Sequence, residues 1–137
     1  MDSRELAIGF FDSGLGGLSV LKEAINILPN EKYIYYGDSI NAPYGNKSAQ
    51  KIRELTLNNV KFMLTKGIKA LVIACNTATS VAIDELRAQF DIPIIGMEPA
   101  IKPAANCRDQ SGKILLLATK MTLQEEKLKD LVGNLNI

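Results

Sequence analysis

Residues 70–79 read Ala-Leu-Val-Ile-Ala-Cys-Asn-Thr-Ala-Thr, and they place a cysteine where an apolar strand gives way to a helix. The apolar run 70–74 is typical of a strand that is covered on both faces of a parallel sheet. A helix N-terminus offers unpaired N–H groups and the positive end of the helix dipole, and both lower the pKa of a nearby thiol. Cys75 is therefore a candidate base or nucleophile. The alternative interpretation is a small buried hydrophobic side chain.

The same order of strand, loop and helix recurs along the rest of the chain. Apolar runs and alternation predict strands at 7–11, 33–36, 70–74, 92–97 and 113–118. Helical periodicity and end signals predict helices at 18–28, between Ser48 and Gly67, at 79–90 and at 122–132. Because strands that alternate with helices form βαβ units, we predict an α/β fold with a doubly wound, mostly parallel sheet flanked by helices.

The composition of the sequence changes from apolar to polar near residue 98. An apolar strand there gives way to a polar connector at 101–111, which contains Pro103 and is expected to be a short helix or an irregular link. We predict an α/β domain over 1–97. Residues 98–137 are predicted to be a connector with one strand and one helix, too little to bury a core alone. They are therefore expected to open an incomplete second domain.

Composition excludes several classes of function. The net charge of +1 and the scattered lysines and arginines give no electrostatic case for nucleic acid or a membrane surface. No apolar run approaches the roughly 20 residues of a spanning helix, and the N-terminus lacks the pattern of a signal peptide, so we expect cytoplasmic residence. The two cysteines are expected to be free thiols. With no histidine and no CxxC motif, we expect no metal site.

Short polar residues follow each predicted strand, at the edge where open parallel sheets bind ligands. They are Asp12 and Ser13, Asp38 and Ser39, Cys75 with Asn76 and Thr77, Glu98, and Thr119. The implied pocket is small, rich in hydrogen-bond donors and backed by helix N-termini, which suits carboxylate or phosphate groups. The sequence therefore predicts a small anionic metabolite as ligand. Cys107, in the polar connector, is expected to be a semi-exposed bystander.

The glycine-rich segment 14–19 allows three interpretations. As a dinucleotide-binding fingerprint it has Ser19 in place of the last glycine, and as a phosphate-binding Walker A loop it lacks the Gly-Lys-Ser/Thr ending. The third interpretation is a tight turn that lets Asp12 face a ligand. Asp12 and Ser13 could instead cap the following helix. The tyrosines at 33, 35 and 36 are most simply explained by strand packing.

Four motifs, taken together, resemble those of glutamate racemases. They are Phe-Asp-Ser-Gly-Leu-Gly-Gly-Leu-Ser-Val-Leu at 11–21, Tyr-Gly-Asp at 36–38, Ala-Pro-Tyr-Gly at 42–45 and Ile-Ala-Cys-Asn-Thr-Ala-Thr at 73–79. Ile-Pro-Ile-Ile-Gly at 92–96, with Glu98-Pro99, extends the similarity. It covers residues 7–119, and the motifs agree in order and spacing.

The resemblance implies an isomerase that interconverts L- and D-glutamate without a cofactor, for peptidoglycan synthesis. In that family one cysteine thiolate removes the α-proton, and a second thiol returns a proton to the opposite face. Carried over, Cys75 would be the first thiol and Asp12 would assist proton handling. The substrate would contact Asp12, Ser13, Tyr44, Gly45, Asn76 and Thr77. Glutamate would be the small-molecule partner, with a homo-oligomer as an open alternative.

One departure from the family is large. Family members place their second cysteine in a Gly-Cys-Thr-His run far along a longer chain, and this sequence has neither that run nor a histidine. Two α/β domains flank the site in the family. We therefore expect these 137 residues to correspond to the first half of such an enzyme, with substrate-binding and half of the catalytic site in 1–97. An inactive fragment or an assembly module that keeps an anionic-metabolite pocket is the alternative.

Overall fold

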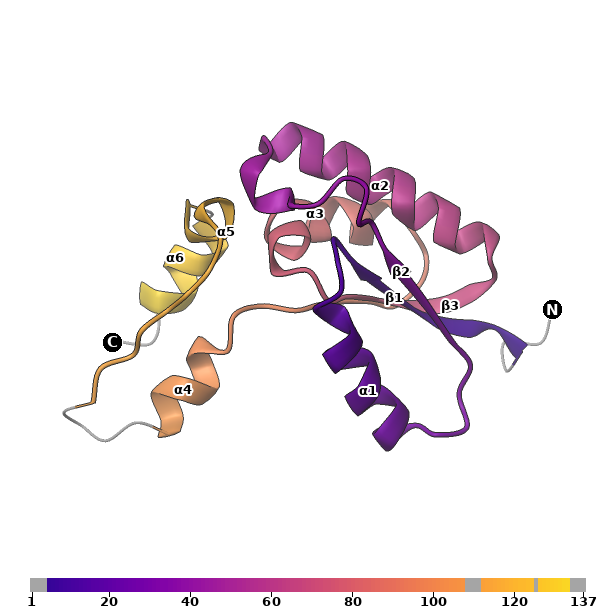
Figure 1. Ribbon diagram of the computed structural model, residues 1–137, viewed down its shortest axis with the longest axis horizontal. Coiled ribbons are helices and arrows are strands. Elements are labelled where there is room, and N and C mark those ends of the chain that lie inside the picture. Colours follow the sequence, from indigo (N-terminus) through magenta and orange to yellow (C-terminus); the bar gives the residue numbers. More distant parts are fainter. Residues whose placement is uncertain (1–4, 108–111, 125, 134–137) are drawn as a thin grey trace.

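The computed structural model describes residues 5–107, 112–124 and 126–133, and its centre is a parallel four-stranded sheet (Figure 1). The strands are β1 (Ala7–Asp12), β2 (Tyr33–Gly37), β3 (Ile68–Ile73) and β4 (Ile94–Gly96). Their spatial order is β2-β1-β3-β4, so β1 and β3 lie in the middle. This confirms the α/β fold and four of the predicted strands.

Helices cover both faces of the sheet. Figure 1 shows α1 (Gly17–Ile27) on one face and α2 (Ala49–Thr65) with α3 (Asn76–Gln89) on the other. The predicted start and end signals of α2 are confirmed. Ser48 Oγ accepts from Lys51 N–H at 3.3 Å, and Gly67 has a φ of +78°, a left-handed conformation that glycine adopts without steric cost.

The main core lies between the sheet and the pair α2–α3. Its fully buried side chains come from both layers and include Phe11, Ile52, Met63, Ile73 and Leu86. The opposite face is more open, because α1 leaves several of its apolar side chains in solvent. Leu18, Ile25 and Leu28, all within the helix predicted at 18–28, are each more than 40% exposed. Phe10, which lies on this face because it alternates with Phe11, is nevertheless only 2% exposed, so α1 covers this side of the sheet as well.

Among the described residues after β4, the chain forms three short helices. They are α4 (Ile101–Cys107), α5 (Lys120–Gln124) and α6 (Glu126–Gly133). The predicted connector is helical over α4, and its residues 108–111 lie outside the described ones. The predicted helix at 122–132 corresponds to α5 and α6. The boundary after residue 97 stays a prediction.

The predicted fifth strand at 113–118 is wrong. These residues form no strand, although exposed and half-buried side chains alternate along them. They have no regular structure, and Ile114 to Leu117 line a hollow together with Ile101 and Ala104 of α4. An alternating pattern indicates a strand only where a neighbouring strand can pair with it. No helix in the described part of the chain has the length and apolar character needed to cross a membrane.

Candidate functional site

The carboxyl ends of β1 and β3 bring together residues that are far apart in sequence. The Cys75 thiol donates to Ser13 Oγ at 3.3 Å, across a separation of 62 residues. Cys75 is also the N-cap of α3, because its sulfur accepts from Ala78 N–H at 3.4 Å. The side chain is 6% exposed. A sulfur in this position would have two donors if ionised, since a serine hydroxyl can rotate to donate and the amide already does.

α3 begins three residues earlier than the sequence suggested. We predicted a start near Thr79, whereas the helix runs from Asn76. Cysteine is not among the usual N-cap residues, so the Cys-Asn-Thr run looked like a loop. The earlier start places Asn76 and Thr77 in the first turn, at the positive end of the helix dipole.

Asp12 is buried and organises the loop that follows β1. Its Oδ2 accepts from Gly14 N–H at 3.2 Å and from Gly17 N–H, the first residue of α1, at 3.1 Å. Neither Asp12 nor Ser13 is the N-cap residue of α1, which is Gly16, but the Asp12 carboxylate does accept from the first N–H of that helix. These hydrogen bonds favour the tight-turn interpretation of the glycine segment. The N–H groups of Gly14 and Gly17 donate to the Asp12 carboxylate and are therefore not free to bind a phosphate.

The pKa of Tyr35 reflects the electrostatic environment at this end of the sheet. Its pKa is raised to about 12, first by burial and then by electrostatic interaction with Asp12 and Cys75. Both groups therefore act on the same phenol. The Tyr35 hydroxyl donates to Gly14 O at 2.8 Å, so it stays a neutral donor at physiological pH.

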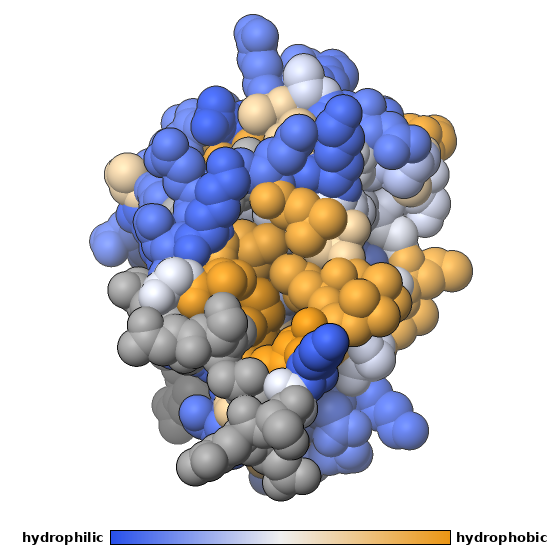
Figure 2. All heavy atoms as spheres, turned by 90° about the vertical axis from the view of Figure 1, so that its left-hand side faces the viewer, coloured by the Kyte–Doolittle hydropathy of each residue, from blue (hydrophilic) through white to orange (hydrophobic). Residues whose placement is uncertain are grey.

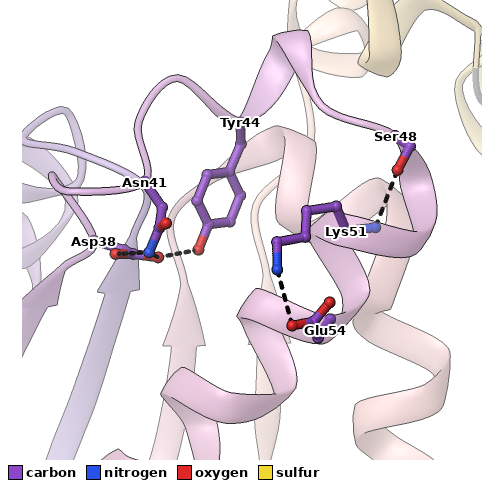
Figure 3. A network of polar contacts seen from close by, with 6 residues as sticks. All are labelled: Asp38, Asn41, Tyr44, Ser48, Lys51 and Glu54. Atoms are coloured by element: carbon purple, nitrogen blue, oxygen red, sulfur yellow. Dashed lines mark hydrogen bonds and ion pairs between the residues drawn. The ribbon is translucent and has the colours of Figure 1, made fainter.

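A second polar cluster lies behind the site and is centred on the buried carboxylate of Asp38 (Figure 3). Tyr44 Oη donates to Asp38 Oδ2 at 2.6 Å, and Asn59 Nδ2 donates to the same oxygen at 2.9 Å. Asn41 Nδ2 donates to Asp38 Oδ1 at 2.9 Å. Burial alone would raise the pKa of Asp38, but the hydrogen bonds from Tyr44, Asn59 and Asn41 together lower it. The pKa of Tyr44 is raised by burial and by its bond to Asp38.

This cluster changes the interpretation of Tyr44. Its ring is 1% exposed and its hydroxyl is engaged by Asp38, so the side chain does not face an open pocket. The predicted substrate contact at Tyr44 can hold only for its main chain. Figure 3 also shows the separate contacts at the start of α2, where Lys51 Nζ pairs with Glu54 Oε1 at 2.9 Å.

Three threonine hydroxyls join α3 to the first turn of α5 and the residue before it. Thr77 Oγ1 lies 3.0 Å from Thr119 Oγ1 and 3.3 Å from Thr122 Oγ1, and the last two are 3.0 Å apart. Gly45 lies beside them, because a Cβ there would be 2.6 Å from Thr119 Cβ. Thr119 was predicted at this edge, although from a strand that does not form.

Thr122 was missed by the sequence interpretation. The signal that could have found it is the Thr-x-x-Thr spacing at the start of α5, since Thr119 Oγ1 accepts from Thr122 N–H as a helix cap does. Asn76 is exposed at the rim of the same region. Glu98 and Ser39 are exposed as well, and Cys107 on α4 is exposed, where a semi-exposed position was predicted.

Two hollows flank the site. One, of about 330 Å³, is lined by apolar residues of 99–104 and 114–117 together with Asn76. Figure 2 shows apolar side chains gathered over the middle of the face that carries these C-terminal segments. The other hollow, of about 400 Å³, is lined by residues 45–48, Lys120, Met121 and Gln124. Among the residues that the structure describes, no group of three or more His, Cys, Asp or Glu could hold a metal ion.

Comparison with known proteins gives a consistent result. A family model described as Asp/Glu/Hydantoin racemase matches residues 16–137. A glutamate racemase of Clostridium novyi is 59% identical over 134 residues, which are 97% of this chain and 51% of that protein. A glutamate racemase of Clostridium botulinum strain Hall is 57% identical over 132 residues, with 96% and 51% covered. The chain thus spans about half the length of these curated relatives.

Solved structures agree with the fold. The crystal structure of Escherichia coli glutamate racemase, in complex with L-glutamate and the activator UDP-MurNAc-Ala, superposes with a TM-score of 0.87 at 39% identity. The match covers 95% of this chain and 49% of that one. The glutamate racemase of Aquifex pyrophilus gives a TM-score of 0.86 at 33% identity, with 95% and 52% covered.

Proposed function

The chain belongs to the Asp/Glu/Hydantoin racemase family, and we propose that it supplies one face of a site that interconverts L- and D-glutamate. The observation that carries this proposal is the contact between Cys75 and Ser13, which places a thiol at the N-terminus of α3 and at the edge of a parallel sheet. The relatives named as glutamate racemases motivate the choice of substrate. A cytoplasmic role in peptidoglycan synthesis is part of the proposal.

The proposed chemistry needs two acid–base groups. The Cys75 thiolate removes the α-proton of one enantiomer, and a thiol on the opposite side of the planar intermediate returns a proton to the other face. One group cannot easily serve both faces of a held carbon. Ala78 N–H, the Ser13 hydroxyl and the dipole of α3 would stabilise the Cys75 thiolate between turnovers.

The other residues of the site would hold the substrate. Asn76 and Thr77 lie in the first turn of α3, where N–H groups suit a carboxylate. The main chain of Tyr44 and Gly45 approaches the same region through Thr119. We propose that Asp12 fixes the loop that carries Ser13 and assists proton handling. No cofactor takes part in the proposed reaction.

The second proton-transfer group is proposed to come from a polypeptide segment other than the described residues. Cys107 is exposed on α4 and lacks the strand-end setting of Cys75. We therefore expect little or no racemisation from the 137-residue chain by itself.

A chimaeric enzyme tests the proposal. The chain is joined to the half of the Clostridium novyi glutamate racemase that it does not match, and racemisation is followed by polarimetry and by α-proton exchange in deuterated water. We expect the chimaera to interconvert both enantiomers of glutamate. A folded chimaera without activity would contradict the proposal. So would robust racemisation by the chain alone that requires Cys75 and not Cys107.

A second candidate function is an assembly module. Leu115 and Leu117 are each 84% exposed beside the apolar hollow, and exposed apolar surface of this kind favours association. On this hypothesis the chain binds another polypeptide and keeps its anionic-metabolite pocket without turnover. Light scattering on the purified chain separates the two candidates, since a clean monomer at high concentration counts against assembly through its own copies.

A further inference from the structure

Tyr35 sits where β2 meets the loop that follows β1. Its backbone pairs with Phe10 in the sheet, and its hydroxyl reaches Gly14 O at 2.8 Å, across 21 residues of sequence. The ring fills a narrow space between two glycines. A Cβ at Gly17 would lie 3.3 Å from Tyr35 Cε2, and a Cβ at Gly37 would lie 3.3 Å from Tyr35 Cε1.

The loop that Tyr35 contacts is the one that carries Ser13. Gly14 is held on both sides, because Asp12 Oδ2 accepts from its N–H and Tyr35 donates to its carbonyl. These bonds fix the two peptide groups that follow Ser13, and so fix the direction in which the Ser13 side chain leaves the backbone. The Ser13 hydroxyl is the group that contacts the Cys75 sulfur.

We propose that Tyr35 is a positioning residue for Cys75, which anchors the glycine loop and thereby holds the Ser13 hydroxyl against the sulfur. The inference deepens the proposed function and rests on the role given there to Cys75. Strand packing alone does not explain the directed bond from the phenol to Gly14 O. The ionisable neighbours of this end of the sheet include Asp12 on β1 and Tyr44 in the 3-10 helix η2 (Tyr44–Asn46), and electrostatic interaction with Cys75 contributes to the raised pKa of both Tyr35 and Tyr44.

The test uses Tyr35→Phe, which keeps the ring and deletes the hydroxyl. Its matched control is Tyr33→Phe, on the same strand and two residues away, so on the same face. The Tyr33 hydroxyl donates to Ala24 O and Leu28 O, at the far end of α1 from Cys75. Both variants carry Cys107→Ser, so that alkylation by iodoacetamide reports on Cys75 alone.

The readout is the ratio of alkylation rates at neutral and strongly alkaline pH, which removes any change in simple access. We expect Tyr35→Phe to lower this ratio about five-fold, the factor that one hydrogen bond of ordinary strength represents. Tyr33→Phe is expected to leave the ratio unchanged. In a Ser13→Ala background, Tyr35→Phe is expected to add no further change, because it acts through that hydroxyl.

Gly37→Ala is a second, independent probe of the same loop. A Cβ at Gly37 would lie 2.5 Å from Gly14 O, so the loop must move, and we expect the same fall in the ratio. Three results would each overturn the inference. They are an unchanged ratio of alkylation rates in both Tyr35→Phe and Gly37→Ala, a fall of the ratio in Tyr33→Phe as large as in Tyr35→Phe, and an undiminished effect of Tyr35→Phe in the Ser13→Ala background. If iodoacetamide does not alkylate Cys75 in the folded parent chain, the proposed function fails as well. If Cys75 is alkylated but the Tyr35 variants behave otherwise than expected, only the inference about Tyr35 fails.

Discussion

Replacing Cys75 by serine is expected to lower kcat of the chimaeric racemase about 10³-fold, which lies within the range for loss of one positioned acid–base group. A serine hydroxyl fits the same space but is a far weaker acid than a thiol, so it cannot supply a base at neutral pH. The Ser13 contact and the α3 N-cap could still form, because oxygen also accepts from Ala78 N–H. The loss should therefore appear in kcat rather than in folding.

Cys107→Ser provides the matched control for that result. This thiol is exposed on α4, and its replacement is expected to leave kcat unchanged. Initial rates in both directions, measured by circular dichroism of glutamate, give the comparison. Equal activity of the Cys75→Ser chimaera and its parent would remove Cys75 from the proposed mechanism.

Replacing Asp38 by alanine is expected to lower the free energy of unfolding by about 3 kcal/mol. The substitution leaves the Tyr44 hydroxyl and the Asn59 amide, both buried, without the oxygen that they share. Urea denaturation at neutral pH measures the loss. Asp91→Ala, at an exposed position after α3, is the control and is expected to cost less than about 0.5 kcal/mol.

The effect of Asp38 should depend on pH in a defined direction. Hydrogen bonds hold the pKa of its carboxyl below the ordinary value in the folded chain. A depressed folded pKa gives stability that is present above the unfolded pKa, about 3.9, and is lost as the pH falls below it. The difference in stability between the parent and Asp38→Ala should therefore narrow in acid. A difference that widens in acid would show that Asp38 is not held ionised by these bonds.

The central elements of the fold could be predicted because local sequence signals and tertiary packing favour the same secondary structure there. The apolar run before Cys75 forms β3, and the Ser48 and Gly67 signals bound α2. The meeting of Asp12, Ser13 and Cys75 at one edge followed from a general property of parallel sheets, that all their strands end on the same side. This required no knowledge of side-chain contacts.

Other features could not be predicted because they depend on long-range contacts. The alternation at 113–118 pairs with no strand of the described sheet, so these residues have no regular structure and line a hollow beside α4. The burial of the Tyr44 side chain was not predicted, because its hydroxyl donates to a buried carboxylate six residues earlier. Tyr35 looked like strand packing, and only the coordinates show its bond to Gly14 O. In each case the tertiary structure determines which group the residue contacts.

Protection of Cys75 by glutamate is the most direct test of its role. The intact 137-residue chain is treated with iodoacetamide at neutral pH, with and without L- or D-glutamate, and the modified cysteines are identified by mass spectrometry. Cys107 serves as the internal reference in the same molecule.

We predict that the thiol capping α3 reacts in the folded chain, and that saturating glutamate slows its labelling while the thiol on α4 reacts at an unaltered rate. Two results would contradict the place of this thiol in the substrate site. One is the absence of alkylation in the native state, and the other is an alkylation rate that neither L- nor D-glutamate changes.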